Sequence, residues 1–410
     1  MANINDYIIW RGDLSFNNAP FNDIDNLIFT EFCYLNFDKI VPQNYSDGFT
    51  LLSDAVIEYF SKNEDTQRSL GYIIPDDIKA MAKMMAKSPR FASLKLTAFQ
   101  SITDVETQMQ FCAMTILLPD GTAFVAFRGT DDTIVGWRED FNMMYTFPVP
   151  SQVCSEAYLC SLMAQFSGDL RLGGHSKGGN LALYAAARCS HDQRHRIIRV
   201  YNNDGPGFDS RMISSEGYGA IKDRITRIVP QTSVVGMLFE HEETYRIVKS
   251  HAKGIFQHNG FSWEVLGTEF VPFDSLTRDS LIVDKSVHSF LAQMDEKESR
   301  IFVESMFEIL GASNAETLTD LMKNKNAFLK ALKTVPPEAR STVIRTIMKI
   351  VAESGHVWLS TVRSKSENDK IEHKADTPKM LKSPEEQDKS ESIPFTLQNA
   401  IKNLFSPKEK

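Results

Sequence analysis

Apolar and polar residues recur at helical spacing through the first part of the chain. The stretch FNDIDNLIFTEFCYLNF, residues 21–37, places apolar side chains three or four positions apart, as an amphipathic helix does. The stretch IPDDIKAMAKMMAKS, residues 74–88, has acidic residues early and lysines late, which suits the helix dipole. We therefore predict a helical N-terminal region over residues 1–95, packed on the core.

The pattern changes to strands alternating with helices over residues 96–290. FCAMTILLPDGTAFVAFRG is two apolar runs around a Pro-Asp-Gly turn, which is typical of a hairpin. After it we expect a helix over 152–165 and the strand LRLGG, then the helix NLALYAAARC and the strands IIRVYNND and RITRIVP. Strand, helix and strand in this order predict a mainly parallel sheet with crossover helices.

Helical spacing returns over residues 291–363, where EKESRIFVESMFEIL is expected to end at Gly311. Residues 364–410 form a charged tail, and 364–392 have too few apolar residues to fold by themselves. Residues 395–405, FTLQNAIKNLF, gather their apolar side chains on one helical face. We expect a short helix that docks weakly on the domain, with a partner- or membrane-docking peptide as the alternative.

The composition limits the classes of protein to which this chain can belong. The 410 residues carry a net charge of −8, which gives no general attraction for nucleic acid. The first residues lack the pattern of a secretory signal, and no apolar run approaches the ~20 residues that cross a bilayer. The five cysteines are scattered without a CxxC pair, which is typical of reduced thiols. We therefore expect a cytoplasmic protein without a transmembrane segment, a disulfide framework or a zinc site.

Candidate chemistry centres on GHSKG, residues 174–178. This is G-x-S-x-G between a predicted strand and a predicted helix, where a strained turn projects a serine from the sheet edge above a helix N-terminus. We interpret Ser176 as a nucleophile. The alternative is a glycine-rich phosphate-binding turn, but G-x-x-x-x-G-K-[ST] is absent because the lysine follows the serine.

The loop after the hairpin, residues 128–131, is the expected second part of this site. In hydrolases of this architecture an early loop supplies one oxyanion N–H group, and the residue after the nucleophile supplies the other. Thr130 and Lys177 are therefore our oxyanion candidates through their backbone N–H groups, and the Thr130 hydroxyl is a further donor. We expect Trp137 to anchor this loop, and Arg138 and Asp140 to brace it as an ion pair.

FRGTDDTIVGWREDF followed by GGHSKGGNLA resembles lipase class 3, the fungal-type lipases. The closer resemblance is to a bacterial α/β-hydrolase family of unknown function that is related to those lipases. Further blocks of that family occur in order here, among them YNNDGPGF, VPQTSVVGMLFEHEE and GIFQHNGFSWEV. The resemblance spans about residues 5–325 and implies an α/β-hydrolase fold and a serine hydrolase.

The acid of the site departs from the lipase pattern. The resemblance implies a triad aspartate near Thr232 or Ser233, but no carboxylate stands there. The acid therefore comes from elsewhere, or the triad is incomplete. Asp204 is the best candidate because it ends a predicted strand and precedes a Gly-Pro-Gly turn. An aspartate at a strand end also commonly caps a turn.

The base is chosen among the histidines that follow Ser176. We favour His258, which precedes an Asn-Gly turn at an expected strand edge and falls within a family block. His288 is the alternative, because DKSVHSFL resembles the segment that carries the catalytic histidine in class 3 lipases. His241 stands among glutamates, which would raise its pKa and suit an ion pair. His251 also remains a candidate, whereas His175 is interpreted as structural.

We therefore predict an α/β-hydrolase core, a mainly parallel sheet with a nucleophile elbow, flanked by helical N- and C-terminal additions. The predicted function is hydrolysis of carboxylic esters, small-molecule or lipid-like, through an acyl-enzyme at Ser176 and without a metal or cofactor. The alternative is a catalytically weak or inactive hydrolase-like scaffold that acts as an interaction protein. Thiol chemistry has little support, because no cysteine lies in a glycine-framed turn.

Overall fold

The computed structural model describes residues 1–320 apart from 63–68, 72–73, 279, 282–284, 286–294, 312–315 and 318. The predictions for residues 364–392 and 395–405, and the candidate base His288, lie outside the described residues.

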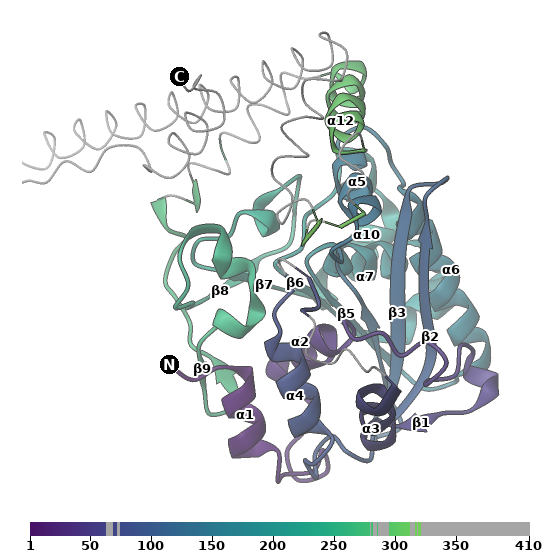
Figure 1. Ribbon diagram of the computed structural model, residues 1–410, viewed down its shortest axis with the longest axis vertical. Helices are drawn as coiled ribbons and strands as arrows, with labels where there is room; N and C mark the ends of the chain where they lie inside the picture. Colours follow the sequence, from purple (N-terminus) through teal and green to yellow (C-terminus); the bar gives the residue numbers. More distant parts are fainter. Residues whose placement is uncertain are drawn as a thin grey trace, which may run out of the picture.

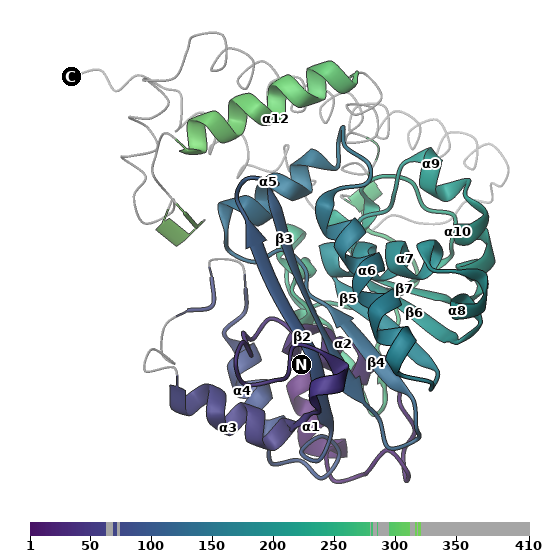
Figure 2. The same ribbon diagram turned by 90° about the vertical axis from the view of Figure 1, so that its right-hand side faces the viewer.

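An eight-stranded sheet forms the centre of the described part of the chain, with its strands in sequence order (Figures 1 and 2). The first four strands are antiparallel, and the pairs from β4 to β8 are parallel. The strands are β1 (Thr50–Leu51), β2 (Lys95–Asp104), β3 (Met109–Leu117), β4 (Ala123–Phe127), β5 (Leu170–His175), β6 (Ile197–Asn203), β7 (Ile225–Pro230) and β8 (Tyr245–Val248).

The predicted hairpin is confirmed as β3 and β4, which pair antiparallel around Pro119 and Gly121. The strand β2 was not predicted from the sequence. Its register shifts between Thr97 and Gln100, and Ala98 lies at a φ of 51°. Such a bulge interrupts the two-residue alternation that identifies a strand in sequence.

Helices cover both faces of the sheet. The first face is covered by α1 (Ile4–Arg11), α2 (Asp23–Phe32), α3 (Leu52–Lys62) and α4 (Asp77–Met85), and the second by α6 (Pro150–Gln165), α7 (Lys177–Arg188) and α10 (Glu216–Ile221). Alternate residues of β4 pack on opposite faces of the sheet, because Phe124 belongs to the first hydrophobic cluster and Val125 to the second. Both faces of β4 are thus buried, as is usual between two helical layers.

The remaining elements are short or lie at the edges. They are the helices α8 (His191–His195) and α9 (Ser210–Ile213), the 3-10 turns η1 (Tyr45–Asp47), η2 (Lys222–Arg224), η3 (Val235–Met237), η4 (Gly254–His258) and η5 (Gly260–Ser262), and the two-stranded sheet of β9 (Val265–Leu266) and β10 (Glu269–Phe270).

A third hydrophobic cluster joins α5 (Ile134–Asn142) to α12 (Glu296–Gly311). The helix predicted to end at Gly311 is therefore present. Figures 1 and 2 show α12 lying across α5, beyond the end of β3. Phe307 packs edge-on against Phe141 with ring centroids 5.9 Å apart.

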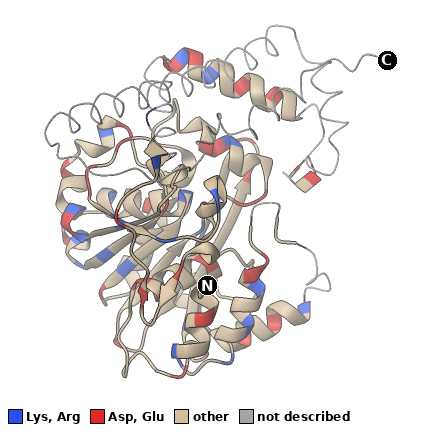
Figure 3. Cartoon of the chain, turned by 90° about the vertical axis from the view of Figure 1, so that its left-hand side faces the viewer, with Lys and Arg blue, Asp and Glu red and all other residues tan. Residues whose placement is uncertain are grey.

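Basic and acidic residues are interspersed along the described chain, as the cartoon in Figure 3 shows. All five cysteines, which lie in the described part, are free. Among the described helices, none is long and apolar enough to span a membrane. The parallel strands, their crossover helices and the serine turn after β5 give this chain the α/β-hydrolase fold.

Candidate active site

Ser176 occupies a strained turn between β5 and α7. Its φ is 58° and its ψ is −134°, a conformation that a residue with a side chain rarely adopts. A Cβ atom on Gly174 would lie 2.0 Å from the carbonyl carbon of Gly178, and one on Gly178 would lie 2.1 Å from the carbonyl oxygen of Phe127. The glycines are therefore required for the turn to close, as the sequence predicted.

Asp204 lies at the same edge of the sheet as Ser176. It follows β6, which runs parallel to β5, and the Ser176 N–H donates to the carbonyl of Asn203 at 3.0 Å. The Asp204 side chain is fully buried. Its Oδ1 accepts the hydroxyl of Ser233 at 2.5 Å, and its Oδ2 lies 2.7 Å from Nδ1 of His258.

Ser233 explains the missing carboxylate near residue 232. The resemblance to the lipases implies an acid there, but the structure places a hydroxyl that donates to the acid from the neighbouring strand end. The carboxylate comes from the end of β6, and the loop after β7 supports it. His258 therefore has a carboxylate partner, Asp204, although no carboxylate stands near residue 232.

His258 ends the 3-10 turn η4, and its side chain is 22% exposed. His258 was expected at a strand edge, but it ends a 3-10 turn, and a loop separates that turn from β8. The neighbouring Gln257 anchors this turn: its carbonyl accepts from the indole of Trp263 at 2.9 Å, and its side-chain oxygen accepts from the Thr232 N–H at 2.8 Å. In the described part of the chain, no group hydrogen-bonds to Nε2 of His258.

Two other candidate histidines have different surroundings. His241 pairs with Glu243 at 3.0 Å, as expected. Its pKa is nevertheless lowered, because burial outweighs the carboxylate that we expected to raise it. His251 is exposed.

His175 contacts the candidate base directly, which the sequence did not reveal. Its Nε2 lies 2.7 Å from the carbonyl oxygen of His258, and the two rings lie 4.5 Å apart between centroids. Burial, together with the neighbouring His258 ring, lowers the pKa of His175 to about 3. The only signal in sequence was its position beside the serine.

The loop after β4 touches the serine. A Cβ atom on Gly129 would lie 3.1 Å from the Cβ of Ser176 and 2.5 Å from the carbonyl oxygen of His175. Among the described residues, no acceptor pairs with the backbone N–H of Thr130 or of Lys177. The Thr130 hydroxyl, expected to donate to an oxyanion, instead donates to Oδ2 of Asp140 at 2.5 Å.

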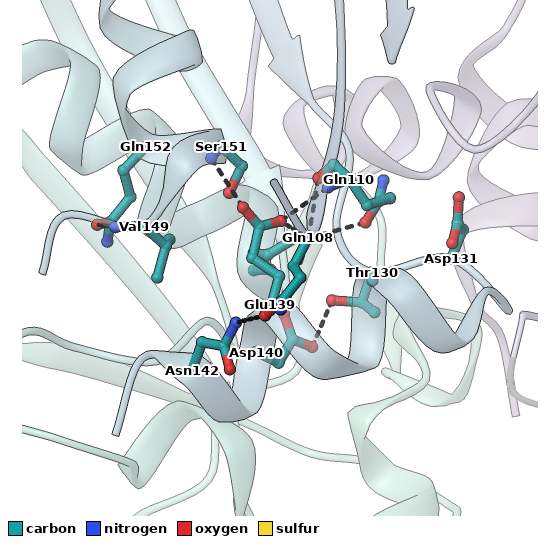
Figure 4. A network of polar contacts seen from close by, with 12 residues as sticks. Gln108, Gln110, Thr130, Asp131, Glu139, Asp140, Asn142, Val149, Ser151 and Gln152 are labelled. Carbon is teal, nitrogen blue, oxygen red and sulfur yellow. Dashed lines mark hydrogen bonds and ion pairs between the residues drawn. The ribbon is translucent and has the colours of Figure 1, made fainter. Parts of the chain in front are cut away.

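The side chain of Lys177 is buried and joins a polar network with Gln110 and Glu139. Its Nζ donates to Glu139 Oε2 at 3.0 Å and to the side-chain oxygen of Gln110 at 2.8 Å. Figure 4 shows Glu139 between Gln110 and Ser151, whose backbone N–H donates to Oε1 at 2.8 Å. The ammonium thus ties the start of α7 to β3 and α5, while the backbone N–H of the same residue is left free for other contacts.

Asp140 does not form the expected ion pair with Arg138. In the described part of the chain its cationic neighbour is Lys177, with Oδ1 3.8 Å from Nζ, and the Arg138 guanidinium lies 5.8 Å from the Phe307 ring centre. Burial raises the pKa of Asp140 to about 6, and Lys177 and the Thr130 hydroxyl act against that rise. Trp137 packs against the third hydrophobic cluster, with residues of α5 and α12.

Among the described residues, no group of three histidine, cysteine or acidic side chains could hold a metal ion.

Three solved structures are similar to this chain. The Rhizomucor miehei lipase propeptide complex, native, is 18% identical with a TM-score of 0.29, covering 38% of this chain and 57% of that chain. M37 lipase is 15% identical with a TM-score of 0.32, covering 52% and 68%. A deletion mutant of the Rhizomucor miehei lipase propeptide complex is 15% identical with a TM-score of 0.31, covering 54% and 82%. This chain thus spans little more than half of the first lipase.

No curated protein matches this chain. A family model does: the model described as Mbeg1-like matches residues 85–308. The match takes in the strands β2 to β8, the serine turn, Asp204 and His258, and it covers more than half of the 410 residues. The chain therefore belongs to the Mbeg1-like family.

Proposed function

We propose that this protein is a serine hydrolase that cleaves carboxylic esters through an acyl-enzyme at Ser176. One observation carries the proposal: a buried carboxylate, Asp204, holds Nδ1 of His258 at 2.7 Å, at the same sheet edge as a serine on a strained turn. A carboxylate, an imidazole and a serine at the edge of one sheet are the parts of a hydrolytic triad.

The reaction begins when the Ser176 oxygen attacks the acyl carbon of the ester and its proton passes to Nε2 of His258. The alcohol leaves with that proton, and an acyl-enzyme remains. Water then attacks the acyl carbon, giving its proton to His258, and the Ser176 oxygen departs with that proton. Asp204 stabilises the imidazolium at both stages, because its carboxylate lies beside Nδ1.

The oxyanion of each tetrahedral intermediate is assigned to the backbone N–H groups of Thr130 and Lys177. The approach of Gly129 to Ser176 supports the first assignment, and the start of α7 at Lys177 supports the second. Fixed N–H donors at a helix N-terminus stabilise a developing negative charge without having to reorient.

The alternative, an inactive hydrolase-like scaffold, was motivated by the missing carboxylate near Ser233. Asp204 lies 2.7 Å from His258, so the lack of a carboxylate near Ser233 no longer favours the scaffold.

Labelling with a fluorophosphonate probe tests the proposal. The wild-type chain is expected to react at Ser176, and Ser176→Ala is expected to abolish both labelling and hydrolysis of p-nitrophenyl esters. Ser61→Ala is the matched control, because Ser61 is an exposed serine on α3. Labelling that persists in a folded Ser176→Ala protein would refute the assignment, as would a wild-type chain inert to both reagents.

A further inference from the structure

His175 has no chemical step in the proposed reaction, yet its side chain touches the base in two ways. Its Nε2 lies 2.7 Å from the backbone carbonyl of His258, and its ring contacts the His258 ring, tilted by 34° with 4.5 Å between the centroids. The first contact holds the main chain of the base, and the second lies against its side chain.

The chemistry of the carbonyl fixes the tautomer of His175. A carbonyl oxygen only accepts, so Nε2 must carry the proton. The buried ring is neutral at assay pH, and its Nδ1 therefore keeps a free lone pair. The Tyr34 hydroxyl, 3.4 Å from Nδ1, is placed to donate to it.

A side chain of the N-terminal region lies next to His175. Glu31, in α2, places Oε1 3.6 Å from Nδ1 of His175, and a Cβ atom on Gly260 would lie 2.8 Å from the same oxygen. Burial raises the pKa of Glu31 to about 8, so at neutral pH the carboxyl keeps its proton. The segment that carries His258 therefore packs against two uncharged side chains, those of Glu31 and His175.

We propose that His175 is a positioning residue for His258, an inference that rests on the proposed function. The Nε2–H donor holds the backbone of the base, and Asp204 fixes Nδ1 of its side chain. Together these contacts leave the imidazole a single orientation. A serine hydrolase needs such precision, because a base displaced by about 1 Å costs roughly 10²-fold in rate.

Two substitutions separate positioning from packing. Glutamine can place its amide N–H where Nε2 stands, so His175→Gln is expected to keep kcat within about threefold of wild type. His175→Leu removes the donor, and a fall in kcat of about 10²-fold is expected, with KM little changed. The matched controls are His195→Gln and His195→Leu, because His195 is exposed on α8, and both should retain full activity.

Proton NMR provides a readout that does not depend on turnover. The hydrogen-bonded Nδ1 proton of His258 should give a downfield resonance in wild type and in His175→Gln, and this resonance should broaden or disappear in His175→Leu. A folded His175→Leu protein with an intact resonance and wild-type kcat would overturn the proposal. If the leucine variant does not fold, loss of the resonance and of kcat in a folded His175→Gln protein would overturn it instead.

The two proposals fail in different ways. A wild-type chain that neither hydrolyses esters nor labels at Ser176 would refute the hydrolase. The NMR comparison would still show whether His175 orders the His258 ring. Activity that disappears in Ser176→Ala but is unchanged in His175→Leu would refute only the positioning role.

Discussion

At the residue scale, the candidate triad is held by contacts that differ in strength. Asp204 binds His258 through a charge-assisted hydrogen bond in a buried setting. Ser233 supports the far oxygen of the same carboxylate. The two histidines and the carboxylate contact one another in series, so substitutions among them are not expected to have additive effects.

Substitution of the base and of the acid should therefore have graded effects. His258→Ala should lower kcat about as much as Ser176→Ala, because triad members act together. Asp204→Asn should cost roughly 10³- to 10⁴-fold, because the imidazole would lose its correct tautomer and its charge partner. Hydrolysis of p-nitrophenyl esters checks both. Full activity in His258→Ala would direct the search to His288 instead.

Glu31 should make the stability of the protein depend on pH. Burial raises its folded pKa from an ordinary value of 4.5 to about 8. Between these values the folded chain holds a proton that the unfolded chain has released, so the free energy of unfolding falls as pH rises. His175 contributes in the opposite sense only below its ordinary pKa of 6.5. Between pH 6.5 and 8, the pH dependence of the free energy of unfolding is therefore expected to come from Glu31 and not from His175.

Urea denaturation at pH 6.5 and 8 tests this expectation. Wild type should lose about 2 kcal/mol over that interval, at roughly 1.4 kcal/mol for each pH unit. Glu31→Gln should lose much less, because an amide does not titrate. Equal losses in the two proteins would contradict the raised pKa.

At the element scale, the N-terminal helices are fixed by a buried ion pair as well as by apolar contact. Arg90 donates to both carboxylate oxygens of Asp25 in α2, at 2.8 and 2.5 Å, and to the carbonyls of Leu14, Ala19 and Pro20. Both charged side chains are fully buried. One guanidinium thus joins the loop after α1, the start of α2 and the turn after α4.

Arg90→Leu should destabilise the protein by about 3–5 kcal/mol, because it leaves the Asp25 carboxylate buried without a cation. The double substitution Arg90→Leu with Asp25→Leu should recover part of that loss. The control is Lys62→Met, which removes an exposed pair with Glu58 on α3 and should cost at most about 1 kcal/mol. Chemical denaturation measures all three. If Arg90→Leu lowers the free energy of unfolding no more than Lys62→Met does, the ion pair is not a main support of these helices.

At the scale of the whole molecule, the N-terminal region is continuous with the hydrolase sheet. Residues of α1 to α4 share one hydrophobic cluster with β3, β4 and the region of Trp263. Asn26 of α2 donates to Asn203 at the end of β6, at 2.9 Å. The helix α12 differs, because its buried side chains form a separate cluster with α5. Separate clusters are expected to open separately.

Phe307→Ala should therefore loosen α12 without unfolding the sheet. It removes the aromatic contact with Phe141 and the ring beneath Arg138. Amide hydrogen exchange should become faster in residues 296–311 and 134–142, and remain unchanged in β5 and α7. Faster exchange throughout the sheet would show that the third cluster is part of the main cooperative unit.

Much of the fold followed from local patterns. Apolar runs bounded by turns identified β3 to β7, and the glycines around Ser176 identified the elbow, because only glycine tolerates such close approaches of backbone. Asp204 was found from its place at a strand end. Local sequence determines these features because each depends on neighbours within a few residues.

Contacts between distant segments were decided by the tertiary structure alone. His258 contacts Asp204, which lies 54 residues earlier in the chain. His175 contacts the turn that carries His258, which lies 83 residues later. The Thr130 hydroxyl was expected at an oxyanion but is taken by Asp140, ten residues away on α5. The pKa of His241 fell where neighbouring glutamates suggested a rise, because burial is set by the packed fold. Spacing in sequence specifies which elements form, but only their packing decides which side chains share a proton.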